Sequence, residues 1–372
     1  MLIKAMLNIY DNETDHLPTI NSQELTDQQV LEHMHAIRQE LGNQVVVLGH
    51  HYQQDDVISL ADYKGDSLQL AKEAAKLEAE YIIFCGVHFM AETADIITSE
   101  NQKVILPDLN AGCSMADMAN RKEIDRAWEN IQNATDEKII PITYINCDAL
   151  LKDFVGQHEG AICTSSNAKK VITWALEKGD KLLFFPDQHL GRNTCSELGI
   201  ELDEMIVYNP NLQHGGVTKE EIAKAKVILW YGYCSVHQGF NINQVNQIKQ
   251  QEPDRTVIVH PECNYEVFKA SHMAGSTSYI INTIKEAPAG SKWAIGTEIN
   301  LVNRLAADFP HLDITSLSPY QCLCTTMYRV RPRWLLESLR SIQRGKAINI
   351  IKVDASIKEN ALKALDRMLN IS

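Results

Sequence analysis

The chain has 372 residues, of which 45% are hydrophobic, as is typical of a globular protein with two or three domains. Its 48 Asp and Glu outnumber its 35 Lys and Arg; the net charge of −13 argues against a general nucleic-acid surface. No apolar run approaches the roughly 20 residues needed to cross a membrane. Residues 1–16 lack the continuous apolar region of a secretion signal, so we expect a cytoplasmic protein.

The first predicted element is an amphipathic helix in the segment QELTDQQVLEHMHAIRQELG, within an N-terminal extension. Short apolar runs follow, most of which end in a polar or glycine-containing turn. We expect these runs to form strands: 46–53, 81–89, 103–108, 139–147, 160–166, 181–188, 226–234, 256–263, 278–283 and 292–298. Helical segments such as NAKKVITWALEKG alternate with them, which indicates βαβ units and parallel sheets.

The predicted strands fall into three groups, with breaks near residues 120–138 and 212–220. The sequence therefore predicts an α/β protein with three αβα domains, although it shows no clear residue-by-residue repeat. The predicted parts are an extension over 1–40, domains over 41–125, 126–215 and 216–330, and C-terminal helices over 331–372.

Polar side chains gather where the predicted strands end, and catalytic groups of parallel sheets lie at that edge. His50 and Tyr52 follow one run, Tyr144 and Asn146 another. His260 and Glu262 follow a third and can act as a general acid–base pair if both face one pocket. The competing interpretation is a structural histidine beside a surface glutamate.

Cys113, Cys234 and Cys324 lie in loops rich in Gly, Ser or Thr, and no two of them share a loop. Three thiols brought together by the fold predict a metal site with a missing fourth ligand, as a catalytic metal requires. Their spacing alone leaves zinc and an iron–sulfur cluster as alternatives.

Two segments, CTSSNA (163–168) and AGSTS (274–278), offer hydroxyls and backbone N–H groups. Such segments at a helix N-terminus bind phosphate or carboxylate, and simple capping of the helix is the alternative.

Taken together and in order, twelve segments between residues 40 and 330 resemble the quinolinate synthase family. They are HHYQ (50–53), GDSL (65–68), CGVHFMAET (85–93), AGCSMAD (111–117), YIN (144–146), CTSSNA (163–168), PDQHLG (186–191), GYCSVH (232–237), HPEC (260–263), GSTS (275–278), GTE (296–298) and CTTM (324–327). The resemblance implies three similar αβα domains around a pseudo-three-fold axis, with the site at their junction.

The resemblance also implies a reaction: iminosuccinate and dihydroxyacetone phosphate condense to quinolinate, with release of phosphate and two waters, in NAD biosynthesis. One 4Fe–4S cluster, held by Cys113, Cys234 and Cys324, would offer an open iron as Lewis acid. Cys322 lies close to Cys324, but CTTM matches the family's C-x-x-M pattern and favours Cys324. L-aspartate oxidase, a source of iminosuccinate, is the expected functional partner.

By the same resemblance, Glu262 and His260 would transfer protons, assisted by Tyr52 and Tyr144. The residues expected to contact substrate come from the matching motifs: His50, Ser67, Tyr144, Ile145, Asn146, Ser165, His260, Pro261, Glu262, Ser276 and Thr277. Two other functions stay open: an aconitase-like hydro-lyase acting on a related dicarboxylate, and an iron–sulfur sensor.

Overall fold

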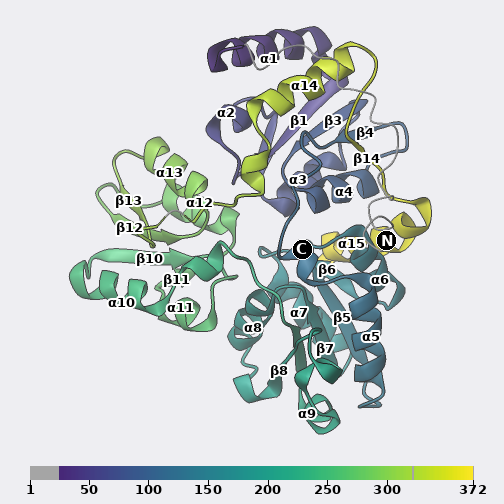
Figure 1. The fold of residues 1–372 in the computed structure, drawn as a ribbon. Coiled ribbons are helices and arrows are strands. Elements are labelled where there is room, and N and C mark those ends of the chain that lie inside the picture. Colours follow the sequence, from purple (N-terminus) through teal and green to yellow (C-terminus); the bar gives the residue numbers. More distant parts are fainter. Residues whose placement is uncertain (1–24, 321, 372) are drawn as a thin grey trace, which may run out of the picture.

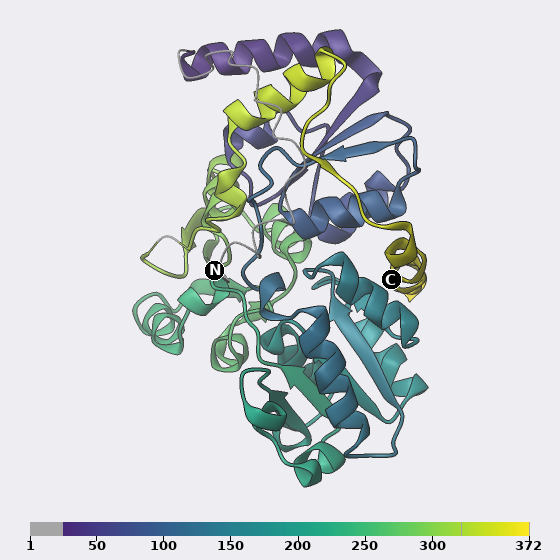
Figure 2. The ribbon, with the colours of Figure 1, turned by 45° about the vertical axis from the view of Figure 1, so that its right-hand side comes forward.

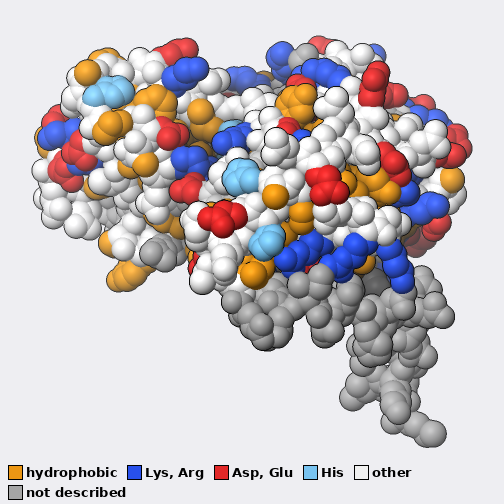
Figure 3. Space-filling model, turned by 90° about the horizontal axis from the view of Figure 1, so that it is seen from above, with side chains coloured by type: hydrophobic (Ala, Val, Ile, Leu, Met, Phe, Trp, Pro, Cys, Tyr) orange, Lys and Arg blue, Asp and Glu red, His pale blue; other side chains and the backbone are white. Residues whose placement is uncertain are grey.

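The computed structural model describes residues 25–320 and 322–371, so the expectations for residues 1–24 lie outside it. Three mostly parallel sheets form three lobes around a central junction (Figure 1). Figure 3 shows acidic, basic and hydrophobic side chains interspersed over the face seen from above. None of the helices in the described ranges is both long enough and apolar enough to span a bilayer.

The first lobe has a sheet in the order β14-β4-β3-β1-β2, in which β14 alone is antiparallel. Its strands are β1 (Val45–His50), β2 (Tyr63–Gly65), β3 (Tyr81–Cys85), β4 (Lys103–Ile105) and β14 (Ile350–Ile351). Its helices are α1 (Asp27–Leu41), α2 (Asp55–Ile58), α3 (Ser67–Ala74), α4 (His88–Ile97) and α14 (Pro332–Gln343). Helices α1 and α14 lie side by side (Figure 2), with Met34 and Leu335 in one core, which confirms the predicted amphipathic helix.

The second lobe has a parallel sheet in the order β6-β5-β7-β9-β8. Its strands are β5 (Ile139–Tyr144), β6 (Ala161–Cys163), β7 (Lys181–Phe185), β8 (Met205–Tyr208) and β9 (Val227–Trp230). Its helices are α5 (Arg121–Gln132), α6 (Ala149–Gln157), α7 (Ala168–Lys178), α8 (Gln188–Glu197), α9 (Lys219–Lys224) and α15 (Ala355–Ile371). Helix α15 packs on α6 so closely that a Cβ at Gly156 would lie 2.0 Å from the Asn360 carbonyl oxygen.

The third lobe has a parallel sheet in the order β11-β10-β12-β13. Its strands are β10 (Arg255–Val259), β11 (Met273–Ala274), β12 (Lys292–Gly296) and β13 (Asp313–Ser316). Its helices are α10 (Ile242–Gln251), α11 (Tyr265–Ala270), α12 (Thr277–Lys285) and α13 (Ile299–Asp308).

The three sheets share one topology, which confirms the predicted α/β fold of repeated αβα units. In each lobe the first strand lies between the second and the third, and a further strand pairs with the third: β2-β1-β3-β4, β6-β5-β7-β9 and β11-β10-β12-β13. In the second lobe this further strand is the fifth, because β8 is added at the edge beside β9. Equivalent strand ends and loops therefore converge on the junction from three directions. The second sheet includes β9, which lies beyond residue 215, the predicted end of the second domain. The domain limits stay a prediction.

One predicted strand is wrong: residues 278–283 lie in α12. Ile280 and Ile284 are both buried, and their spacing of four places them on one face of a helix. A short apolar run fits a buried strand or a buried helix equally well, and here Ser276 caps the helix start.

Candidate active site

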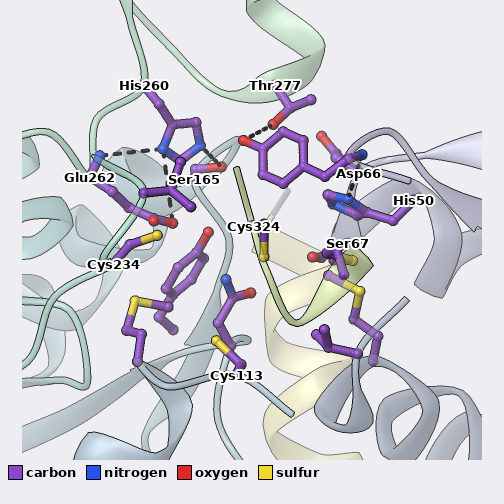
Figure 4. Close-up of a pocket in the computed structure, with 18 of the residues that line it drawn as sticks. His50, Asp66, Ser67, Cys113, Ser165, Cys234, His260, Glu262, Thr277 and Cys324 are labelled. Atoms are coloured by element: carbon purple, nitrogen blue, oxygen red, sulfur yellow. Dashed lines mark hydrogen bonds and ion pairs between the residues drawn. The ribbon is translucent and has the colours of Figure 1, made fainter. Parts of the chain in front are cut away.

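A cavity lies at the junction and is lined by side chains from all three lobes (Figure 4). Most of the residues that the sequence predicts for the site line it. These are His50, Tyr52, Ser67, Cys113, Tyr144, Asn146, Ser165, Cys234, His260, Glu262, Thr277 and Cys324. The fold therefore brings together motifs that are far apart in the sequence.

The first strand of each lobe contributes two lining residues with one residue between them. The pairs are His50 and Tyr52 after β1, Tyr144 and Asn146 after β5, and His260 and Glu262 after β10. The residue between the two members of each pair does not line the cavity. Ile145 lines a smaller cavity behind the wall, and the Pro261 carbonyl accepts a hydrogen bond from Asn193.

The helices that follow the second strands add a ring of hydroxyls. Ser67, Ser165 and Thr277 line the cavity at or near the starts of α3, α7 and α12. Ser276 instead caps α12, because its hydroxyl accepts from the Tyr279 N–H at 3.2 Å.

Asp66 joins the three helix starts, and our sequence analysis did not predict it. Its Oδ1 caps α3, while its Oδ2 accepts from Ser166 at 3.1 Å and from Ser278 at 2.5 Å. The signal that could have identified it is its place in the GDSL segment, directly before Ser67.

The three cysteines occupy equivalent positions, each following the strand that pairs with the third strand of its lobe: β4, β9 and β13. Each precedes by three residues a 3-10 turn: Ala116–Met118, His237–Gly239 and Met327–Arg329. Each also packs against two cores. Cys113 contacts those of the first and second lobes, Cys234 those of the second and third, and Cys324 those of the first and third. The thiols therefore lie on the three seams between lobes.

Burial raises the pKa of all three thiols, that of Cys113 to about 12. The backbone N–H groups of Ala116, His237 and Met327 oppose this, each by a hydrogen bond to the sulfur three residues before it. Buried thiols with N–H donors to sulfur suit an iron–sulfur cluster, whose positive metal charge stabilises thiolates. Cys322 does not belong to the wall of the cavity; its Sγ lies 3.8 Å from the Tyr320 carbonyl oxygen.

His237 is a site residue that the sequence analysis did not single out, although it lies three residues after Cys234 in GYCSVH. Its Nδ1 lies 2.8 Å from Glu262 Oε2, and its ring stacks on His260 with centroids 4.5 Å apart. Cys234, His237 and Glu262 together offer ligand atoms within 4.8 Å of one another, a second arrangement able to hold a metal ion. The contact between His237 Nδ1 and Glu262 Oε2 already uses two of those three donors.

Comparison with known proteins agrees with this geometry. The family model described as Quinolinate synthetase A protein matches residues 32–370. The chain belongs to the quinolinate synthase family. It is 53% identical over 341 residues to quinolinate synthase of Geobacillus sp. (strain WCH70), covering 91% of this chain and 92% of the relative. It is 49% identical over 369 residues to quinolinate synthase of Bacillus subtilis (strain 168), covering 99% and 100%.

The carboxyl group of Glu262 is ionised in this member of the quinolinate synthase family. Burial by itself raises its pKa, but the nearby His237 and His260, with hydrogen bonds from His237 and Tyr144, outweigh burial and lower the pKa to about 2. The carboxylate is therefore free to accept a proton, but so low a pKa makes it a weak base, since general-base catalysis is most effective when the pKa lies near the working pH.

The two histidines at strand ends are neutral, because burial lowers the pKa of both His50 and His260 to about 3. In each, Nδ1 accepts the backbone N–H two residues later, at 3.2 Å from Tyr52 and 3.3 Å from Glu262. The ring proton therefore lies on Nε2, and each histidine is a hydrogen-bond donor. His260 Nε2 lies 3.3 Å from the Ser165 hydroxyl.

Burial raises the pKa of Tyr52 and of Tyr144 well above the usual value, so both phenols keep their protons. The cavity of this quinolinate synthase relative thus combines one proton acceptor, Glu262, with several neutral donors.

Proposed function

We propose that this chain condenses iminosuccinate with dihydroxyacetone phosphate to quinolinate, releasing one phosphate and two waters. The imine supplies the nitrogen and four carbons of the product, and the triose supplies three carbons. The observation that carries the proposal is that three cysteines, one from each lobe, line one cavity with an ionised Glu262 and a ring of hydroxyls.

We propose further that Cys113, Cys234 and Cys324 hold a 4Fe–4S cluster. Their buried positions on the seams and the N–H donors to their sulfurs support this assignment. Bound there, the cluster supplies a Lewis-acidic iron with one open coordination position.

The chain's own residues provide the acid–base chemistry in this proposal. Glu262 accepts a proton from the carbon of iminosuccinate that forms the new bond, and the phenol of Tyr144 donates to a departing hydroxyl. Asn146 Oδ1, buried and unpartnered within the described part of the chain, accepts an N–H or O–H of the substrate.

The hydroxyl ring is the proposed anion site. Ser67, Ser165 and Thr277 lie where the N-terminal ends of three helices meet, and helix N-termini favour carboxylate and phosphate. His50 and His260 add neutral Nε2–H donors, which bind anions without the charge of a lysine. Cytoplasmic location and supply of the imine by L-aspartate oxidase belong to the same proposal.

The test is purification without oxygen, measurement of iron and sulfide, and assay of quinolinate and phosphate from the two substrates. We expect about four irons per chain, as a 4Fe–4S cluster requires, with quinolinate and phosphate formed in equal amounts. Cys113→Ser should lose iron and activity, whereas Cys322→Ser, the matched control, should keep both. A full cluster without quinolinate would favour the hydro-lyase or the sensor, and zinc in place of iron would contradict the cluster.

A further inference from the structure

Thr297 lies behind the cavity wall and connects two site residues from different parts of the chain. It directly follows β12 and is fully buried. Its hydroxyl oxygen lies 2.9 Å from the Tyr52 hydroxyl and 3.3 Å from His237 Nε2. One side chain thus joins the end of β1 in the first lobe to the loop that carries Cys234.

These contacts belong to a longer chain of hydrogen bonds. Beyond Tyr52, the Thr277 hydroxyl lies 3.1 Å from the phenol oxygen. Beyond His237, Nδ1 lies 2.8 Å from Glu262 Oε2. The chain therefore begins and ends at two residues of the cavity wall, Thr277 and Glu262, both labelled in Figure 4, and Thr297 is its midpoint.

The hydroxyls of Thr277, Tyr52 and Thr297 can each both donate and accept, so the four bonds form one continuous series that ends at Glu262. Hydrogen bonds linked in series strengthen one another, and loss of the Thr297 hydroxyl would break the series at its midpoint.

The local structure holds Thr297 in place. Its neighbour Glu298 is buried and caps α13, where its Oε2 accepts from the Asn300 N–H at 2.8 Å. Glu298 Oε1 lies 3.4 Å from the Cys324 backbone nitrogen, and the Asn300 side chain donates to the Tyr52 carbonyl at 3.2 Å. The start of α13 is thus bound to the end of β1 and to the loop that carries Cys324, which holds the neighbouring Thr297 in place.

We propose that Thr297 is a positioning residue for the reaction. Its hydroxyl holds the ring of His237 against Glu262 and orients the phenol of Tyr52 beside Thr277. The expected effect of this inference on kcat rests on the proposed function. The hydrogen-bond geometry on which it stands is independent of the substrate.

The experiment compares Thr297→Val, which removes the hydroxyl at nearly constant volume, with Thr297→Ser, which keeps it. Thr297→Val should lower kcat about 10- to 100-fold, as misplacement of catalytic groups does, with little change in KM and in iron content. Thr297→Ser should restore most of kcat. Thr93→Val is the matched control, because Thr93 is also buried and its hydroxyl donates to the Phe89 carbonyl outside this chain of bonds.

Two results would overturn the inference: wild-type kcat in Thr297→Val, or a Thr297→Ser variant as impaired as the valine. Absence of quinolinate from the wild type would instead contradict the proposed function. A second measurement covers that case. Nitrogen-15 NMR of labelled histidines, assigned with His237→Gln, should show a different Nε2 resonance for His237 in Thr297→Val than in the wild type, because the valine removes the hydrogen-bond partner of Nε2. An unchanged Nε2 resonance in the valine variant would refute the positioning role.

Discussion

The ends of β1 and β10 form the same local turn but carry different chemistry. In both, a buried histidine accepts the backbone N–H two residues later and presents Nε2–H as a donor. The residue that supplies this N–H is Tyr52 after β1 and Glu262 after β10. The repeated fold therefore fixes the orientation of both imidazole rings. The side chain two residues after each histidine decides whether the turn offers a proton donor, as Tyr52 does, or a proton acceptor, as Glu262 does.

The surroundings of these two side chains explain the difference. Two threonine hydroxyls contact the Tyr52 phenol, and burial holds its pKa well above the usual value. Glu262 has His237 beside it, and the attraction of the histidines lowers its pKa despite burial. A residue from a neighbouring loop, rather than the strand itself, keeps the carboxylate charged.

The largest effect is expected where the two turns differ most, at Glu262. Glu262→Gln keeps the size and the hydrogen bonds but cannot accept a proton, so turnover should fall by roughly 10³- to 10⁴-fold, the upper range of general-base catalysis. Iron content should stay at the wild-type value. Full activity in this variant would remove Glu262 from the mechanism.

The other turn should be less sensitive. Tyr52→Phe removes a phenol that assists but does not accept the substrate proton, and we expect a loss of turnover of about 100-fold. Tyr208→Phe is the control, because the Tyr208 hydroxyl is bonded to Asn130 at 2.9 Å within the second lobe. Equal losses in Tyr52→Phe and Glu262→Gln would show that the two turns are not chemically distinct.

The shared part of the turns predicts a shared dependence of stability on pH. Burial lowers the pKa of His50 and of His260 to about 3, below the unfolded value of 6.5. The unfolded chain binds these protons first, so the stabilisation is complete above pH 6.5 and is lost as the pH falls toward 3. At pH 5 each histidine should cost about 2 kcal/mol of unfolding free energy relative to pH 8.

Urea unfolding of the wild type and of His50→Asn and His260→Asn at pH 8 and pH 5 measures this dependence. Each variant should lose less stability than the wild type between the two pH values, and by similar amounts. A variant that keeps the full wild-type decrease would show that its histidine is not held neutral by burial.

The smallest effect is expected at the starts of α3 and α12, the helices that follow the second strands of the first and third lobes. Ser276 caps α12 where Asp66 caps α3, and only Asp66 lines the cavity. Ser276→Ala should therefore lower the unfolding free energy by about 1 kcal/mol, the value of a helix cap, and leave KM unchanged. A raised KM would place Ser276 in the substrate site.

The framework of the fold is predictable because central strands of parallel sheets are continuous apolar runs. The five strands that the sequence analysis did not find all lie at sheet edges: β2, β8, β11, β13 and β14. These strands have only two to four residues, so none offers an apolar run long enough to predict a strand, although β8 (MIVY) is apolar throughout. The common order of strands is invisible in the sequence because it depends on pairing, not on residue identity.

For the site, residue types at strand ends indicate the lining pairs, whereas the places of Ile145 and Pro261 depend on the turns that follow the strands. His237 and Thr297 could not be predicted in this way, because neither belongs to these pairs. Each contributes to the site only through hydrogen bonds to residues of other segments. Which thiols share a cavity likewise depends on how the three lobes meet, so that spacing alone left the metal undecided.

Helix α15 has a consequence for how the protein is made. The second lobe is encoded in the middle of the chain, yet its core includes four side chains from the end of the sequence: Ala361, Ala364, Leu365 and Met368. During synthesis the ribosome delivers this last apolar layer after the rest of the lobe has emerged. Nascent chains that stall before residue 355 would expose the uncovered face of α6 to chaperones and proteases.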